Sequence, residues 1–496
     1  MAAVIDHVIV LMLENRSFDH LFAYSGLDGL TGVDISKVNP GPDGDVPMSA
    51  AASDRAAADP KHEFEDVDWQ IYRAPRTADN RTATLTGFVE RSGPDIMRCV
   101  PASAAGILTQ LARRYCVCDR WFSSMPGPTW PNRFFVHAGS SGGLSNSPSN
   151  VATAGSVLVD DLGFSFAHGT LYDRLSAAGK SWRVYYGDHF PQVCAIDTMP
   201  SVFVADTQKF RPFEQFAGDM ARGDVADYTF IEPDYDILNS FRDGNSQHPL
   251  GSLSQGEQLI KDVYNGLAGS NAWNTSLLIV TYDEHGGFYD QELPPPAVPP
   301  GDGGVNAAKA ANPVTPPFDF DRLGLRVPAV VVSPWISPGT VSHTPYDHTS
   351  VIRTVFDVFK LPGQLTDRDA AAASLTSLLG DTLHASPLGL ETAAAVLSGA
   401  LERVDPHRGA DTVSGLAGYT RIAAQVHHAL LQYQDGMQPH GLRAAVRAQP
   451  DLSTLVGLPK TDSADESRAY IASVAAMLSA HRQRQGAASA GAPTAP

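Results

Sequence analysis

The stretch Val8-Ile9-Val10-Leu11-Met12-Leu13 leads directly into Glu14-Asn15-Arg16-Ser17-Phe18-Asp19-His20. Six consecutive apolar residues predict a strand that is buried on both faces, as in the sheets of α/β proteins. Ligands of such sheets bind beyond the carboxyl ends of the strands, where Glu14 and Asn15 would lie. Their carboxylate and amide oxygens suit a divalent cation. Alternatively, Asn15 and Ser17 only cap a helix that follows the strand.

A second junction of the same kind lies far along the chain. The run Ser276-Leu277-Leu278-Ile279-Val280-Thr281-Tyr282 follows an amphipathic helix expected over residues 256–267 and ends in Asp283-Glu284-His285-Gly286-Gly287. Neighbouring parallel strands end at the same edge of a sheet, so we expect both acidic clusters to converge on one metal ion.

Strands and helices alternate between these junctions, which favours a doubly wound α/β fold with a mostly parallel central sheet. Further strands are expected over 181–186, 227–231 and 327–333, and helices over 169–178 and 350–360. Residues 41–59 and 294–317, rich in Pro, Gly, Ala and Asp, are expected to be surface loops around the catalytic edge.

The C-terminal part of the chain is rich in alanine. Helical periodicity is visible over 392–404, 418–434 and 464–480. We therefore expect a catalytic domain over residues 1–375, a smaller helical C-terminal region over 376–485 and a disordered tail over 486–496.

Composition limits the partners of this chain. Its 496 residues are 43% hydrophobic and 18% charged, and 36 basic against 54 acidic residues give a net charge of −18. Nucleic acid and anionic membrane surfaces are disfavoured, because both bind basic residues. No run reaches the ~18 apolar residues of a membrane span, so we expect no integral membrane association. The first residues lack the basic region of a secretion signal, so we expect a cytoplasmic location unless a leader has been removed.

The loop Ser124-Met125-Pro126-Gly127-Pro128-Thr129-Trp130-Pro131-Asn132-Arg133 is the third candidate for chemistry. Its prolines restrict where the Thr129 hydroxyl can point, and a bound cation would make that hydroxyl a competent nucleophile. Asn132 and Arg133 could donate hydrogen bonds to a phosphate oxyanion. Alternatively, the loop is a turn in which Thr129 caps a helix.

Together with Tyr346-Asp347-His348-Thr349-Ser350, these motifs resemble the bacterial phospholipase C and acid phosphatase family of phosphoesterases. The four motifs stand in the family's order. The resemblance covers about residues 5–374, including Arg326-Val327-Pro328 and Ser333-Pro334-Trp335, and fades beyond them.

The resemblance implies a three-layer, alkaline-phosphatase-like fold. It also implies an enzyme that hydrolyses a phosphate ester or phospholipid. It implies one divalent metal ion held by Glu14, Asn15, Thr129, Asp283 and Glu284. Thr129 would also attack phosphorus and form a phosphothreonine. These oxygen ligands suit calcium, magnesium or manganese, and zinc also accepts carboxylates.

The histidines expected to move protons are His248, His285 and His348, and those expected to bind substrate are His62 and His189. Asp347 precedes His348 and could fix its tautomer. His137 departs from the family, which usually has a small residue there. Two alternatives are a non-catalytic member that binds a ligand or partner, and a sulfatase-like enzyme. The intact ligand residues oppose the first, and the threonine nucleophile opposes the second.

Overall fold

The computed structural model describes most of the chain. It covers residues 3–102, 106–149, 163–384, 387–390, 419–427, 429–430 and 464–490. The helix expected over 392–404 lies outside these residues.

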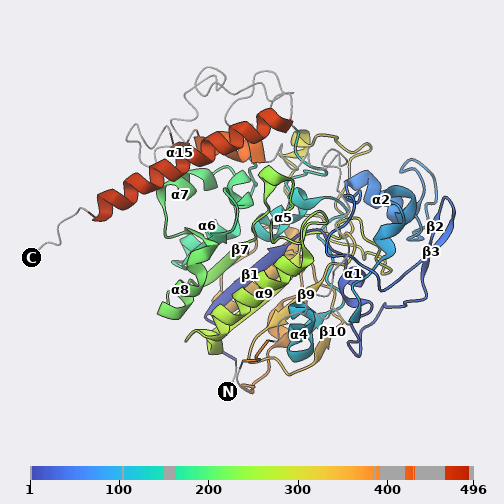
Figure 1. Ribbon diagram of the computed structural model, residues 1–496, viewed down its shortest axis with the longest axis horizontal. Coiled ribbons are helices and arrows are strands. Elements are labelled where there is room, and N and C mark those ends of the chain that lie inside the picture. The colour runs from blue at the N-terminus through green and yellow to red at the C-terminus, as the bar shows by residue number, and fades with distance from the viewer. Residues whose placement is uncertain are drawn as a thin grey trace, which may run out of the picture.

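An eight-stranded sheet forms the centre of the molecule, in the order β10-β4-β9-β8-β1-β7-β5-β6 (Figure 1). Its strands are β1 (His7–Leu13), β4 (Cys116–Cys118), β5 (Trp182–Tyr186), β6 (Phe210–Pro212), β7 (Tyr228–Glu232), β8 (Ser276–Tyr282), β9 (Ala329–Val332) and β10 (Thr340–Ser342). All strand pairs are parallel except those of β9, which is antiparallel to β8 and β4. The expected α/β fold with a mostly parallel sheet is confirmed.

The two strands that end in acidic residues are direct neighbours. β1 and β8 pair in parallel from His7 with Ser276 to Leu13 with Tyr282. Every residue of β8 is buried, as are six of the seven in β1. The residues after Leu13 and after Tyr282 therefore emerge side by side at one edge of the sheet.

Helices cover both faces of this sheet. The α-helices of the described residues are α1 (Phe18–Phe22), α2 (Phe64–Tyr72), α3 (Phe88–Ser92), α4 (Ile107–Arg114), α5 (Thr129–Ala138), α6 (Leu171–Ala177), α7 (Met199–Ala205), α8 (Phe216–Arg222), α9 (Leu253–Ala268), α10 (Thr349–Phe359), α11 (Asp367–Ala371) and α15 (Ala464–Ala490). The helix expected over 256–267 is α9, which begins earlier because Ser252 caps it.

The aromatic contacts of β5 and β7 show the three layers. Trp182 and Tyr228 are paired across the two strands, and both rings contact Tyr172 of α6. Tyr185 points to the opposite face, where its ring meets Phe216 of α8 edge-on at 5.1 Å. Because successive side chains of a strand alternate between faces, α6 and α8 lie on opposite sides of the sheet.

Two expectations about irregular segments need correction. A hairpin of β2 (Val38–Gly41) and β3 (Gly44–Pro47) occupies the start of the loop expected over 41–59. Helix α15 continues to Ala490, so residues 486–490 are helical and not a disordered tail. Alanine has the highest helix propensity, which explains why this Ala-rich end extends the helix. No helix of the described residues is both long and apolar enough to cross a membrane.

Candidate active site

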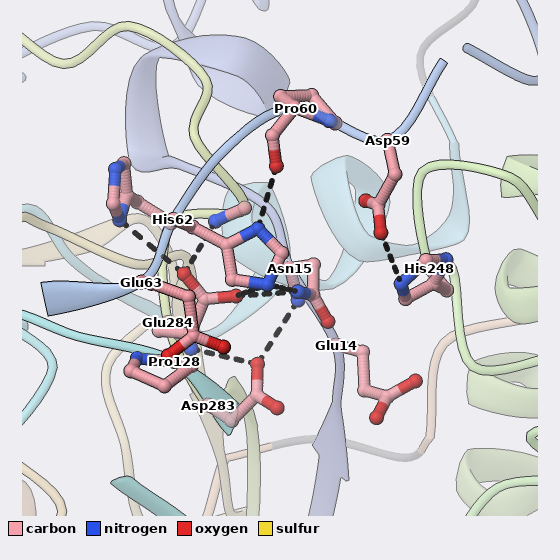
Figure 2. A network of polar contacts seen from close by, with 12 residues as sticks. Glu14, Asn15, Asp59, Pro60, His62, Glu63, Pro128, His248, Asp283 and Glu284 are labelled. Carbon is pink, nitrogen blue, oxygen red and sulfur yellow. Dashed lines mark hydrogen bonds and ion pairs between the residues drawn. The ribbon is translucent and has the colours of Figure 1, made fainter. Parts of the chain in front are cut away.

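Asn15 ties the ends of β1 and β8 together. Its backbone N–H donates to Oδ1 of Asp283 at 3.0 Å, and its side-chain amide donates to Oε1 of Glu284 (Figure 2). Asn15 adopts a φ of 56°, a left-handed conformation that asparagine tolerates better than most residues. Capping of α1 falls to Ser17 alone, whose hydroxyl accepts from the backbone N–H of His20 at 3.1 Å. The alternative that Asn15 only caps a helix is therefore wrong.

Glu14 is buried at the same edge. Its Oε1 accepts from the amide of Gln192 at 3.4 Å. Its Oε2 and the Oδ1 of Asn15 are buried and have no hydrogen-bond partner among the described residues. Burial raises the pKa of Glu14 to about 8; Arg133 opposes this rise and Asp283 adds to it. Two buried oxygens without donors are what a bound cation would satisfy.

Thr129 stands at the start of α5. Pro128 is the N-cap and makes no side-chain cap bond, so the Thr129 hydroxyl is not used as a cap. The loop before it is held by Asn132, whose amide donates to the carbonyls of Met125, Gly127 and Pro128 at 3.0–3.2 Å. Thr129 is partly exposed, whereas Trp130 beside it is buried. The loop therefore leaves Thr129 partly accessible at the start of α5.

One cavity brings together four of the predicted residues, Glu14, His62, Thr129 and His248. It is lined by Glu14, His62, Pro128, Thr129, Trp130, Ser147, Gln192, Phe241, His248 and Tyr419. Glu14 and Thr129 thus face the same space, with Asp283 and Glu284 bonded to Asn15 behind Glu14.

Two histidines of the cavity have opposite hydrogen-bond arrangements. The Nδ1 of His62 lies 2.7 Å from the carbonyl of Pro60, so its Nε2 accepts from the Asn15 amide at 3.1 Å. The Nδ1 of His248 accepts from the backbone N–H of Leu250 at 3.3 Å, which places its proton on Nε2. That Nε2 lies 3.6 Å from Oδ2 of Asp59 (Figure 2). His248 is therefore arranged to donate a hydrogen bond through Nε2, and His62 to accept one.

His285 and His348 lie behind the acidic pair and not among the residues lining the cavity. The Nδ1 of His285 is 3.4 Å from Oε2 of Glu284, and its Nε2 is 2.8 Å from the Gln70 amide oxygen. The Nε2 of His348 is 2.6 Å from the carbonyl of Asp283. Their contacts position Asp283 and Glu284, so the geometry favours a supporting role over proton transfer.

Three predicted substrate-binding residues, Asn132, Arg133 and His189, are not among the residues lining this cavity. Asn132 holds its own loop. Arg133 is buried and bonds Oδ2 of Asp283 at 3.2 Å and the carbonyls of Met12 and Leu13. His189 lines a different cavity with Asp188 and Asp234. Polar residue type alone indicated a ligand role, whereas the fold uses Asn132 and Arg133 for internal hydrogen bonds.

Sequence reasoning missed Ser147 in the cavity wall and four further residues of the cavity region: Asp59, Gln192, Phe241 and Tyr419. The ring of Phe241 stacks on His248 with centroids 3.8 Å apart. Asp59, three positions before His62 in a loop of mostly small residues, was the only one of the four with a local signal. The other three come from segments whose approach to the site depends on the fold.

A metal ion would find oxygen ligands at this edge. In the described part of the chain, no three His, Cys, Asp or Glu side chains form a metal-binding group by themselves. The expected set combines three carboxylates with the amide of Asn15 and the hydroxyl of Thr129. The unsatisfied oxygens of Glu14 and Asn15 make these residues a fit for a hard cation.

A threonine hydroxyl, buried carboxylates and two histidines at the carboxyl edge of an α/β sheet are groups that suit the hydrolysis of phosphoric esters. The Phosphoesterase family model matches residues 5–362, and the chain belongs to this family. It is therefore an enzyme that hydrolyses phosphoric esters.

Curated relatives include non-specific phospholipase C5 of Arabidopsis thaliana, which is 32% identical over 75% of this chain and 73% of its own. Phospholipase C B of Mycobacterium tuberculosis is 27% identical over 75% and 77% of the two chains. A solved structure of a protein in the alkaline phosphatase superfamily from Vibrio parahaemolyticus aligns with a TM-score of 0.33 and 10% identity, covering 75% of this chain and 71% of that one.

Proposed function

We propose that this phosphoesterase is a metal-dependent phospholipase C-type phosphodiesterase in which Thr129 is the nucleophile. The observation that carries the proposal is the cavity that Thr129, the first residue of α5, lines together with Glu14, His62 and His248. The names of the curated relatives support a phospholipid as substrate. The resemblance also includes acid phosphatases, so a phosphate monoester is the substrate to compare.

The reaction has two steps. The Thr129 oxygen forms a bond to phosphorus, the bond from phosphorus to the diacylglycerol oxygen breaks, and the proton lost by Thr129 ends on that oxygen, so that diacylglycerol leaves as an alcohol. His248, which carries its proton on Nε2, donates a hydrogen bond that stabilises the negative charge developing on the leaving oxygen. Water then cleaves the phosphothreonine, which releases the phosphorylated head group and restores the Thr129 hydroxyl.

Glu14, Asn15, Thr129, Asp283 and Glu284 would hold the metal. When bound, it would favour the alkoxide form of Thr129 and offset negative charge on the phosphoryl oxygens. Asn15 orients two of these residues through its backbone and side-chain bonds to Asp283 and Glu284. Arg133 further fixes Asp283 through a hydrogen bond to its Oδ2.

The test compares the wild-type enzyme with Thr129→Ala and Thr129→Ser on phosphatidylcholine and on a nitrophenyl phosphate monoester. Thr129→Ala should lose at least about a thousandfold in kcat/KM, and Thr129→Ser should retain part of the activity, because it keeps the hydroxyl. Mass spectrometry of acid-quenched enzyme should find phosphate on Thr129. Full activity in Thr129→Ala would exclude the mechanism.

Metal dependence is tested separately by elemental analysis. Glu14→Gln should contain less divalent metal than the wild type, because it loses a charged ligand. Asp45→Asn, in the exposed hairpin of β2 and β3, is the charge-matched control and should bind as much metal as the wild type. Equal metal contents in all three proteins would remove Glu14 from the ligand set.

A further inference from the structure

Tyr419 belongs to the C-terminal region yet lines the cavity that contains Glu14, Thr129 and His248. It lies beyond residues 5–362, the part of the chain that the family model matches. Its ring packs edge-on against Trp130, which follows Thr129, with centroids 5.8 Å apart, and against Tyr235 at 6.1 Å. A segment outside the matched family region therefore forms part of the wall of the site.

The segment that carries Tyr419 is firmly attached to the catalytic domain. Arg421 donates to the carbonyl and the hydroxyl of Ser149, each at 3.0 Å. Ile422 and Val426 are fully buried. The position of Tyr419 beside Trp130 is thus fixed by contacts on both sides of the ring and along the segment.

The hydroxyl of Tyr419 is buried and has no hydrogen-bond partner among the described residues. Such a group costs free energy in a folded protein and calls for an explanation, of which a ligand is one. Oε2 of Glu14, in the wall of the same cavity, is also without a donor, so the two groups do not satisfy one another. Burial raises the pKa of Tyr419 well above its ordinary value, so the phenol keeps its proton and can only donate to an anion.

We infer that Tyr419 is a substrate-binding residue whose hydroxyl donates a hydrogen bond to an oxygen of the substrate's phosphoryl group. The inference rests on the proposed function, because it takes a phosphoric ester as the occupant of this cavity. It assigns to the C-terminal region a direct part in binding the substrate, in addition to its packing on the sheet domain.

The experiment uses Tyr419→Phe in the full chain, which keeps the ring packing and removes only the hydroxyl. The KM for phosphatidylcholine and the Kd for inorganic orthophosphate, measured by calorimetry, should both rise about tenfold, as expected for a hydrogen bond to a charged group. The kcat should stay within about twofold and the melting temperature should not fall, because no bond within the protein is lost.

Tyr228→Phe is the matched control. The Tyr228 hydroxyl is also buried and without a partner among the described residues, but it lies in β7 and not in the cavity wall. This variant should bind orthophosphate and substrate like the wild type.

The outcomes separate the two proposals. If Thr129→Ala is inactive but Tyr419→Phe has wild-type KM and Kd, the role of Tyr419 is overturned and the proposed function stands. An equal loss of affinity in Tyr228→Phe would also overturn it. A wild-type protein that neither hydrolyses the esters nor binds orthophosphate would overturn both.

Discussion

The backbone N–H of Asn15 donates to the side-chain carboxylate of Asp283 at 3.0 Å, so the residues that follow two neighbouring strands are bonded to each other. Asn15 reaches this position by taking a left-handed backbone conformation. The relative placement of Glu14, Asp283 and Glu284 therefore depends on the local backbone as much as on the strands that precede them.

Gly286 should be intolerant of a side chain for this reason. A Cβ there would lie 2.0 Å from the carbonyl oxygen of Asn15, at a φ of 63°. We expect Gly286→Ala to lower the free energy of unfolding by about 2–4 kcal/mol and kcat/KM by at least about tenfold, because the Asn15 backbone must move. Urea unfolding and steady-state kinetics measure both.

The control is Gly303→Ala, where φ is 78° but no heavy atom lies within 4 Å of the added Cβ. This substitution has the same backbone strain but no steric clash of the added Cβ. It should lower the free energy of unfolding by about 1 kcal/mol and leave the activity unchanged. Equal effects of the two substitutions would show that the contact with Asn15 is unimportant.

Asp59 should act through His248. The carboxylate lies 3.6 Å from Nε2, the proton-bearing nitrogen, and its negative charge favours the orientation in which that N–H faces it. We expect Asp59→Asn to reduce kcat by about 10- to 100-fold with little change in KM, because orientation of a hydrogen-bond donor to the leaving oxygen affects the chemical step more than binding. Stopped assays across pH 5–9 give both parameters.

Asp45→Asn removes one negative charge from the exposed β2–β3 hairpin and serves as the comparison for Asp59→Asn. Its kcat should equal that of the wild type. The role assigned to Asp59 would be refuted by an unchanged kcat in Asp59→Asn.

Arg326 joins two buried carboxylates. Its guanidinium bonds Asp290 at 2.8 Å and Asp19 at 2.9 Å, and all three side chains are fully buried. Arg326→Met should cost about 3–5 kcal/mol in the free energy of unfolding, because it leaves two buried acids without their cation. Chemical denaturation measures this loss.

Arg98→Ala tests whether an exposed ion pair contributes as much to stability as the buried ion pairs of Arg326. Arg98 bonds Asp95 at 3.0 Å, but both side chains are about half exposed, at 50% and 49%. Water and salt screen such a pair, so the unfolding curve should not change measurably. If Arg326→Met changed the free energy of unfolding as little as Arg98→Ala, burial would not explain the strength of the Arg326 ion pairs.

His137 should make the protein sensitive to acid. Burial lowers the pKa of His137 to about 3, whereas an unfolded histidine titrates near 6.5. Between these values only the unfolded chain binds the proton, so stability falls as pH decreases, by about 1.4 kcal/mol per pH unit from this residue. His137→Asn should reduce the slope of unfolding free energy against pH in this window by that amount.

Tyr172→Phe separates the effect of His137 protonation from the effect of the contacts around His137. The Tyr172 hydroxyl lies 3.1 Å from Nδ1 of His137, so its loss should lower stability without flattening the pH slope. An unchanged slope in His137→Asn would show that this histidine is protonated in the folded protein.

Much of the architecture could be predicted because its signals are local. The apolar runs before Glu14 and before Asp283 each predict a buried strand, and the polar residues after them predict a site at one edge. Neighbouring positions in the parallel sheet then follow from topology, as the pairing of β1 with β8 confirms. The helix α9 was visible from its spacing of apolar residues, and only its start at Leu253 was missed.

The roles of individual polar residues were harder to predict because residue type does not fix a direction. Asn132 and Arg133 follow the nucleophile loop and carry donors suited to phosphate, yet their donors bond carbonyls and Asp283 inside the protein. His285 and His348 similarly contact the acidic pair from behind. Which side of the sheet edge each side chain faces is decided by packing.

The sequence by itself determined the family, the α/β class and the two strand ends that carry Glu14, Asn15, Asp283 and Glu284, since these depend on short runs and motifs. Only the tertiary structure decided that Asp59 faces His248, that Gln192 contacts Glu14 and that Tyr419 closes the wall of the site. These contacts join segments far apart in the chain. They form because the packing of the buried faces of helices and strands brings those segments together. Local sequence patterns therefore do not predict them.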